Sequence, residues 1–244
     1  MNDKLTNHVK DKIGKWNIIY SEERKFIWYK NPKTAGTSMY RGIIKNEIKD
    51  VTSYKDNPKE FDLWWDSLTD EKINDYFTFT FIRNPFDRLV SAFCHVVMEN
   101  FFRLYSHTNS TAELSLSNIF MLFNLFVQRG LDNWDKDDYS MFSASSHWMP
   151  QNFFYEVGGY QMVDFIGKYE NLKGDWSYVA KKLKVSNELP FVDASTTGKG
   201  MGKSRMETQK LHYSEFYKSQ AIVDKVLEFY KKDFEFLNYE LKNV

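Results

Sequence analysis

The chain alternates short apolar runs with segments in which apolar residues recur every three or four positions. Short β-branched and aromatic runs are typical of strands, and the longer spacing is typical of helices. Residues 16–20 and 25–30 predict two strands joined by the polar turn 21–24, and therefore a hairpin. Residues 77–82 (FTFTFI) predict the clearest strand, and residues 162–166 predict a third core strand.

Helical spacing lies between and after these strands. It predicts helices over residues 38–47, from Pro85 onward, and over residues 114–128, 172–183 and 219–232. Pro85 suits the first position of a helix. The helix after it would bury one apolar face, formed by Phe86, Leu89, Val90, Phe93 and Val97. A different face would carry Arg88, Ser91 and His95. Strands that alternate with helices favour an α/β fold with a mostly parallel sheet.

Neither an internal repeat nor a Gly/Ser/Pro-rich linker divides the 244 residues. The length fits one domain, so we predict a single domain over residues 1–244. Residues 51–75 are polar and turn-rich. They and residues 100–160 are expected to be excursions from the core.

Composition and charge narrow the classes of function. Lys+Arg and Asp+Glu each number 33, and this neutral balance argues against a general nucleic-acid binder. The single cysteine, Cys94, excludes an internal disulfide and fits a reducing compartment. The N-terminus lacks the apolar core of a signal peptide. The most apolar run, residues 119–127, is shorter than the roughly 20 residues of a spanning helix. We therefore expect a soluble, cytoplasmic protein.

The segment 32–38 (PKTAGTS) lies between a predicted strand and a predicted helix. A helix N-terminus presents free N–H groups and the positive end of its dipole to an anion. Gly36 would let the backbone approach a ligand closely. The loop also supplies a positive charge and hydroxyl groups, from Lys33, Thr34, Thr37 and Ser38. We interpret it as a cradle for a phosphate or sulfate. The alternative is an ordinary turn in which Thr37 or Ser38 caps the helix.

This loop is not a Walker A loop, which requires G-x-x-x-x-G-K-[ST]. Residues 197–204 (TGKGMGKS) come nearer to that pattern, but Thr197 replaces the first glycine and no strong strand precedes them. We interpret this segment as a basic lid and not as a nucleoside triphosphate site. Its cations would be Lys199, Lys203 and Arg205.

A second motif spans residues 79–93. Arg83 follows the strand at its C-terminal end, where open α/β sheets bind ligands. An arginine fork and a hydroxyl can grip a terminal phosphate, and Arg83 and Ser91 supply them. In the alternative interpretation, Arg83 and Arg88 pair with nearby acids and Ser91 is merely exposed.

Together the two motifs resemble the sulfotransferase superfamily, and most nearly the group of carbohydrate sulfotransferases and their bacterial relatives. Three further segments resemble the family in the same order: residues 146–151 (SHWMPQ), 163–172 and 229–239. The ordered set covers most of residues 25–240. The resemblance implies a P-loop-NTPase-like, three-layer α/β fold with a central, mostly parallel sheet flanked by helices.

The resemblance also implies PAPS (3′-phosphoadenosine 5′-phosphosulfate) as sulfuryl donor, PAP as product and no required metal. The 5′-phosphosulfate would be held by Lys33, Thr34, Ala35, Gly36, Thr37 and Ser38. The 3′-phosphate would be held by Arg83 and Ser91. Lys33 would also be catalytic, because it would stabilise charge on the bridging oxygen as the bond to sulfur breaks.

A general base would take the proton of the acceptor hydroxyl, and histidine is poised for this near neutral pH. His147 matches the family's His-Trp-x-Pro-Gln segment and is the preferred base. The other candidates are His95, Glu47, Asp62 and Glu99. The chain departs from the family in two ways: it has no histidine between the two phosphate motifs, and Met149 replaces a basic residue. The second departure argues against an acidic polysaccharide acceptor.

The implied acceptor is therefore a hydroxyl-bearing sugar or small metabolite. Four tryptophans would either stack on a sugar ring or belong to the core: Trp64, Trp65, Trp134 and Trp148. A P-loop kinase or nucleotidase is an alternative. It is disfavoured by the lack of a Walker A loop and by Arg83, which stands where a metal-binding aspartate would follow the strand. A non-catalytic binder of PAP or another nucleotide is a third interpretation.

Overall fold

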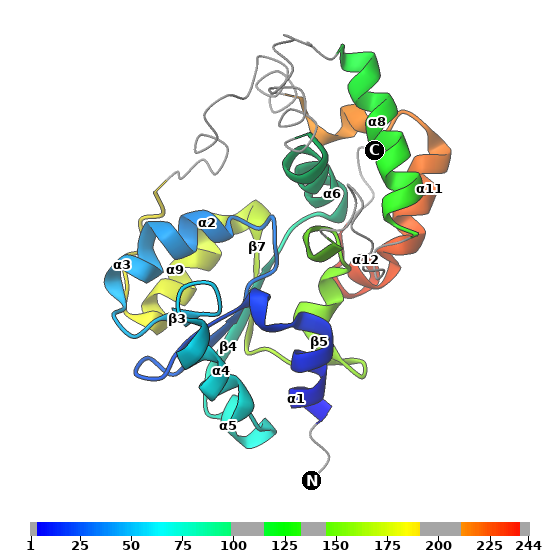
Figure 1. The fold of residues 1–244 in the computed structure, drawn as a ribbon. Helices are drawn as coiled ribbons and strands as arrows, with labels where there is room; N and C mark the ends of the chain where they lie inside the picture. The colour runs from blue at the N-terminus through cyan, green and yellow to red at the C-terminus, as the bar shows by residue number, and fades with distance from the viewer. Residues whose placement is uncertain (1–3, 99–114, 133–144, 191–210, 240–244) are drawn as a thin grey trace. The chain divides into compact units, whose positions relative to one another are not determined.

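The computed structural model describes residues 4–98, 115–132, 145–190 and 211–239 (Figure 1). The chain forms two compact units. The first comprises Met1–Arg83 and Gln151–Ala194 and contains a β-sheet. The second comprises Asn84–Pro150 and Ser195–Val244 and is helical over its described residues. The expectation of one domain over residues 1–244 stays a prediction.

The sheet of the first unit has five strands in the order β3-β1-β2-β4-β7. They are β1 (Ile18–Ser21), β2 (Phe26–Tyr29), β3 (Thr52–Ser53), β4 (Phe77–Ile82) and β7 (Phe165–Lys168). β1 and β2 form the predicted antiparallel hairpin, and β3 adds to β1 in the antiparallel sense. β4 lies parallel to both β2 and β7. The prediction of an α/β fold is confirmed, with a sheet that is mixed: parallel on one side and antiparallel on the other.

The third core strand begins later than predicted. The apolar run indicated residues 162–166, whereas β7 spans Phe165–Lys168. Asp164 explains the shift, because its carboxylate accepts a hydrogen bond from the backbone N–H of Thr78 at 2.7 Å. The N–H of Asp164 in turn bonds the carbonyl of Thr78 at 2.9 Å. Asp164 therefore ends the preceding turn, and the strand pairs with β4 only after it.

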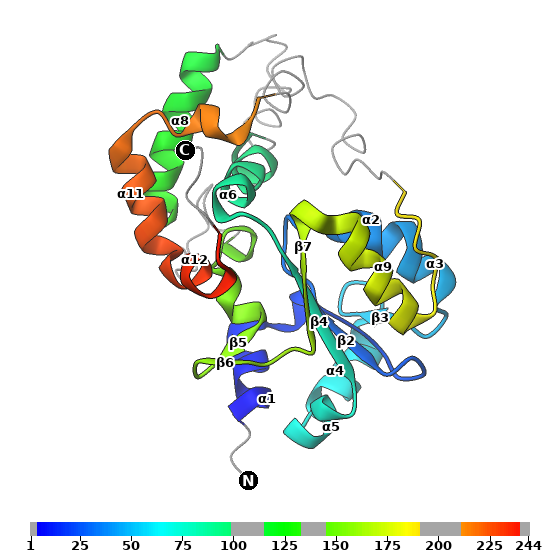
Figure 2. The ribbon, with the colours of Figure 1, turned by 180° about the vertical axis from the view of Figure 1, so that it is seen from behind.

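Helices cover both faces of the sheet. One face packs against α2 (Gly36–Met39), the π-helical turn Tyr40–Ile44 and α9 (Leu172–Leu183). The short helix α3 (Lys45–Glu47) follows this turn and is exposed. Figures 1 and 2 show α2, α3 and α9 gathered on this side. The buried residues Trp28, Phe79 and Phe81 belong to this cluster. On the opposite face Tyr20 stacks on Trp64 of α4 (Pro58–Asp66), with ring centroids 3.9 Å apart.

Residues 51–75 contain two helices that the sequence analysis did not predict. α4 begins after Asn57, whose side chain accepts from the N–H of Glu60, and α5 (Asp70–Asn74) begins after Thr69, which caps Lys72. Asn57-Pro58 and Thr69 are ordinary start signals, so the caps were readable in the sequence. Trp64 is 5% exposed and belongs to the core of this unit.

The remaining elements of the first unit are small. They are α1 (Lys4–His8), the hairpin of β5 (Glu156–Val157) with β6 (Tyr160–Gln161), the π-helical turn Val9–Ile13, and the 3-10 turns Lys15–Asn17, Gln151–Phe154 and Tyr169–Asn171. The carboxylate of Asp70 accepts from the N–H and the hydroxyl of Thr6, each at 2.7 Å. These bonds hold α1 against α5.

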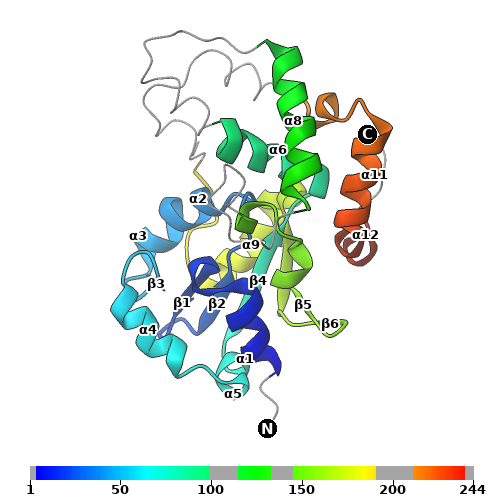
Figure 3. The same cartoon turned by 45° about the vertical axis from the view of Figure 1, so that its right-hand side comes forward.

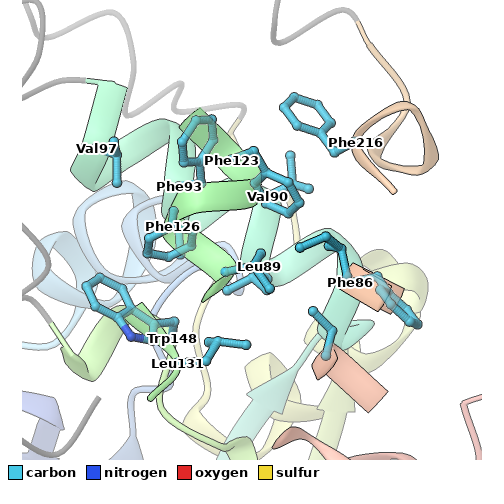
Figure 4. Packing of buried hydrophobic residues seen from close by; sticks show 14 of the residues in the cluster. Phe86, Leu89, Val90, Phe93, Val97, Phe123, Phe126, Leu131, Trp148 and Phe216 are labelled. Carbon is cyan, nitrogen blue, oxygen red and sulfur yellow. The ribbon is translucent and has the colours of Figure 1, made fainter. Parts of the chain in front are cut away.

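The second unit is built from α6 (Pro85–Phe93), α8 (Leu116–Gly130), α11 (Gln220–Phe229) and α12 (Lys231–Leu237). Shorter turns occur at Cys94–Met98, Ser145–His147 and Tyr213–Phe216. Figure 3 shows α8 beside α11, although about a hundred residues separate them. The predicted apolar face of α6 is buried in full, and Trp148 packs into the same core (Figure 4). Among the described residues, no helix combines the length and apolarity that crossing a membrane requires.

Gly167 of β7 offers a stability test of this packing. A Cβ atom added there would lie 2.4 Å from the Phe81 ring, whereas one added at Gly36 would meet Lys30 at 3.4 Å. We expect Gly167→Ala to lower the free energy of unfolding by about 2 kcal/mol, because overpacking forces neighbours to shift. Gly36→Ala should leave it within about 0.5 kcal/mol. Urea denaturation would compare them, and equal stability of the two variants would contradict this packing.

Candidate functional site

The loop after β2 is held by its own polar groups. Asn31 is fully buried, and its backbone carbonyl accepts a hydrogen bond from the Thr34 hydroxyl at 2.8 Å. Lys33 and Ala35 have positive φ angles of 70° and 65°. Non-glycine residues adopt this left-handed conformation at a cost of about 1–3 kcal/mol each, and it tends to persist at ligand sites. The segment 32–38 therefore has a defined backbone conformation that is less favourable than that of an ordinary turn.

The helix after this loop begins without a side-chain cap. Ala35 occupies the N-cap position and makes no side-chain hydrogen bond to the first turn, and Thr37 and Ser38 lie inside the helix. The alternative interpretation, in which Thr37 or Ser38 caps the helix, is therefore wrong. Residues 36–47 are helical without a break. First-turn N–H groups without a side-chain cap suit an anion.

Gly36 does not carry the unusual backbone angles of the loop, which fall on Lys33 and Ala35 instead. Its neighbour in space is Lys30, whose Cγ would lie 3.4 Å from an added Cβ. The predicted role of Gly36, close approach of the backbone to a ligand, stays a prediction.

Positive charge gathers beside the loop. Lys30 follows β2 directly and is partly buried. Burial lowers the pKa of Lys30, and the charges of Lys55 and Arg41 lower it further, against an opposing effect of Asp56. These cations repel one another, so a bound anion would offset an excess of positive charge.

Arg83 follows β4 and reaches this loop within the same unit. Its Nη1 donates to the carbonyl of Lys33 at 3.3 Å, and its guanidinium lies 4.1 Å from the centre of the Tyr169 ring. Its backbone N–H and C=O are both bonded to the side chain of Gln151, at 3.0 and 2.8 Å. The structure therefore brings together Lys33 and Arg83, one from each of the two predicted anion-binding motifs and 50 residues apart in the sequence.

In the helical unit, Asn84 caps α6 by accepting from the N–H of Phe86 at 2.9 Å. Arg88 is fully buried, and its Nη1 donates to the carbonyl of Met149 at 2.9 Å. Ser91 and His95 are partly exposed. Arg88 thus supports the chain around residue 149 from inside the unit. Of the predicted polar face, only Ser91 and His95 reach solvent.

The two histidine candidates lie together in the helical unit. The ring centroids of His95 and His147 are 5.1 Å apart, with an angle of 37° between the rings. The sequence analysis treated them as alternatives, and they are 52 residues apart in the chain. Their proximity makes a shared role in proton transfer chemically feasible, since a proton can pass between nearby imidazoles or through one water.

Other candidate bases have structural partners. Glu47 accepts from the N–H of Ser186 at 2.8 Å, and Asp62 forms an ion pair with Lys15 at 2.9 Å. Glu99 lies outside the described residues. So do Trp134 and the basic segment with Lys199, Lys203 and Arg205.

The tryptophan predictions divide as follows. Trp148 is completely buried and donates its indole N–H to the carbonyl of Gly130 at 3.3 Å. Trp64 is buried against Tyr20. For both, the core interpretation is confirmed and the sugar-stacking interpretation is wrong. Trp65 is partly exposed.

The sequence is similar to known proteins over most of its length. The model of the sulfotransferase family matches residues 16–240. Carbohydrate sulfotransferase 14 of Danio rerio is 25% identical over an alignment 245 residues long, gaps included, which covers 93% of this chain and 63% of that protein. Carbohydrate sulfotransferase 11 of Rattus norvegicus is 26% identical over an alignment 258 residues long, gaps included, covering 93% and 68%. The chain thus spans about three fifths to two thirds of the length of these relatives. No solved structure matches it.

Proposed function

Because the chain belongs to the sulfotransferase family, we propose that it moves a sulfuryl group from PAPS to a hydroxyl of an acceptor. The observation that carries this proposal is the joining of the two anion motifs, in which the Arg83 guanidinium bonds the Lys33 carbonyl at 3.3 Å. Two anion sites in contact suit a donor that carries phosphate groups on both its 5′ and 3′ positions. The finer fold assignment, a P-loop-NTPase-like three-layer arrangement, belongs to the same proposal.

The loop would hold the 5′-phosphosulfate. Its backbone N–H groups, those of Thr34, Ala35 and Gly36 included, the Lys33 ammonium and the hydroxyls of Thr37 and Ser38 are the proposed donors. The fully buried Thr34 already bonds the Asn31 carbonyl and would support the loop as well. Arg83 would hold the 3′-phosphate through charge-assisted hydrogen bonds. Ser91 belongs to the helical unit, and its proposed contact with the 3′-phosphate rests on the family resemblance.

The reaction needs positioning and neutralisation of charge. The acceptor oxygen forms a bond to sulfur while the bond from sulfur to the bridging phosphate oxygen breaks. Lys33 offsets the negative charge that develops on that bridging oxygen. The acceptor proton would pass to an imidazole, His147 in the first instance; His147 belongs to the helical unit, and this role rests on the family resemblance. His95 lies beside it, with 5.1 Å between ring centres.

For the acceptor we propose a carbohydrate or a small hydroxyl-bearing metabolite. The supporting observation is that the relatives reported above are named carbohydrate sulfotransferases. Action in the cytoplasm is part of the proposal and rests on the expectation from the sequence alone. The kinase alternative is not favoured, because the family match runs over residues 16–240. A non-catalytic binder would keep the same donor site and lack turnover.

Calorimetric titration with PAP tests the proposal, with ATP and ADP as comparison ligands and no added metal. We expect PAP to bind at least about tenfold more tightly than ATP, since only PAP carries the 3′-phosphate that Arg83 would contact. Preference for ATP in the presence of magnesium would overturn the proposal in favour of a kinase. Tight PAP binding without sulfuryl transfer to any sugar or metabolite tested would favour the non-catalytic interpretation.

A further inference from the structure

Beyond the end of the backbone ladder between β2 and β4, side-chain hydrogen bonds connect the two strands. The last backbone pair in this ladder is Trp28 with Phe79. Beyond it the Thr80 hydroxyl donates to the carbonyl of Tyr29 at 2.7 Å. The amide of Asn31 then donates to the carbonyl of Phe81 at 3.1 Å. The carboxyl ends of the two strands are therefore held together at the edge from which both anion motifs depart.

Gln151 completes this arrangement. Its Oε1 accepts from the backbone N–H of Arg83 at 3.0 Å and from the side-chain amide of Asn31 at 2.9 Å. Its Nε2 donates to the carbonyl of Arg83 at 2.8 Å. The side-chain amide of Gln151 thus bonds Arg83 as a neighbouring strand would. Gln151 and Asn31 are both 0% exposed, so water does not compete for these bonds.

Together these hydrogen bonds form a closed ring that includes the donor loop, which is the segment of residues 32–38 that would hold the sulfuryl donor. Asn31 is bonded to Gln151 and, through its carbonyl, to the Thr34 hydroxyl. Lys33, between them in sequence, accepts from the Arg83 guanidinium. Arg83 returns to Gln151 through its backbone. A shift of Gln151 would therefore move Arg83 relative to the loop.

We propose that Gln151 is a positioning residue of the donor site, which holds Arg83 in register with the loop so that both phosphate-bearing ends of the donor are bound at once. This inference rests on the proposed function. Its physical basis is that a misplacement of about 1 Å in a binding group can reduce its effect by orders of magnitude. Gln151 does not touch the donor in this scheme and acts through Arg83 and Asn31.

Two variants separate positioning from simple support of the fold. Gln151→Met removes the three side-chain hydrogen bonds described above at nearly constant volume. Gln151→Glu, when protonated, restores them, because its carbonyl can accept from Arg83 and Asn31 while its O–H donates to the Arg83 carbonyl. When ionised it loses that donor and faces the carbonyl with a second acceptor. Burial would raise the pKa of the introduced carboxyl, whereas the charges of Arg83 and Lys33 would lower it.

Affinity for PAP at about pH 5.5 and about pH 8.5 is the readout, always as a ratio to the unchanged protein at the same pH. We expect Gln151→Met to weaken PAP binding about tenfold or more at both values. At the higher pH, Gln151→Glu should weaken PAP binding as much as Gln151→Met does. At the lower pH, its PAP affinity should recover to within about threefold of that of the unchanged protein. Asn17→Leu is the matched control, since it removes another buried amide bond of this unit, to the carbonyl of Ile13 at 2.9 Å. It should lower the melting temperature and leave PAP affinity within about twofold.

The inference would be overturned if both Gln151 variants bound PAP within about twofold of the unchanged protein at both pH values. Equal weakening by Asn17→Leu would also overturn it, because loss of any buried amide would then suffice. Amide hydrogen exchange keeps the inference testable if the unchanged protein binds no PAP, a result that would count against the proposed function alone. Gln151→Met is expected to speed exchange at residues 31–38 and at Arg83, and unchanged exchange in the loop would show that Gln151 does not couple the two.

Discussion

Replacing Lys33 with alanine is expected to slow sulfuryl transfer about a thousandfold, while PAP affinity falls only about tenfold. The larger effect on rate follows from the proposed role of the ammonium, which meets the greatest negative charge when the bond from sulfur to the bridging oxygen breaks. Binding of the product nucleotide uses the rest of the loop as well. Transfer of labelled sulfuryl from PAPS to an acceptor found by screening sugars would measure the rate. Release of PAP from PAPS in water serves as a second assay.

Lys184 provides a matched control for this substitution. It is an exposed lysine with a positive φ of 55°, at the C-terminal end of α9, so Lys184→Ala makes the same chemical change at a similar backbone conformation. We expect the control to keep the rate and the PAP affinity of the unchanged protein. A rate for Lys33→Ala above about one tenth of normal would mean that another group neutralises the bridging oxygen.

Strands and helices with strong local signals were predictable to the residue. β4 coincides with the predicted run 77–82, because alternating Phe and Thr favour a strand and Pro85 starts a new helix. α9 coincides with residues 172–183. The last predicted helix, 219–232, divides into α11 and α12 at Tyr230. Tyr230 is fully buried and its hydroxyl bonds the carbonyl of Trp148, a tertiary contact with no local signature.

The residue types of the donor loop were predictable, but its conformation was not. Glycine is the usual carrier of a positive φ, whereas in this loop Lys33 and Ala35 adopt that conformation, and the sequence analysis gave Gly36 only a role in close approach to a ligand. The cost of the left-handed residues has to be met by long-range bonds such as that from Arg83 to the Lys33 carbonyl. Such bonds cannot be read from a stretch of seven residues.

Gln151 shows the same limit more strongly. In the sequence it belongs to the segment 146–151 that resembles the family, and the sequence analysis assigned it no role of its own. Its partners Arg83 and Asn31 lie 68 and 120 residues away. A single glutamine among mostly apolar residues gives no periodic pattern. Its role becomes clear only from the positions of the ends of β2 and β4 in the structure.

Replacing Arg83 with alanine should change which nucleotide the protein prefers. We expect PAP affinity to fall about a hundredfold, because a charge-assisted pair with the 3′-phosphate is worth roughly 1.5–3 kcal/mol or more where water is partly excluded. Affinity for adenosine 5′-phosphate, which lacks the 3′-phosphate, should change less than about threefold. Calorimetry with the two ligands measures both values on the same sample.

Arg83→Lys refines the test, because lysine keeps the charge but loses the planar fork that bonds Lys33 and lies over Tyr169. It should recover only part of the PAP affinity. Arg24→Ala, at an exposed turn position between β1 and β2, is the control and should bind both nucleotides normally. If Arg83→Ala weakened both ligands equally and lowered the melting temperature, Arg83 would be a support of the loop and the 3′-phosphate would be read elsewhere. Selective loss of PAP would instead make Arg83 the residue that distinguishes a 3′-phosphorylated donor from other adenine nucleotides.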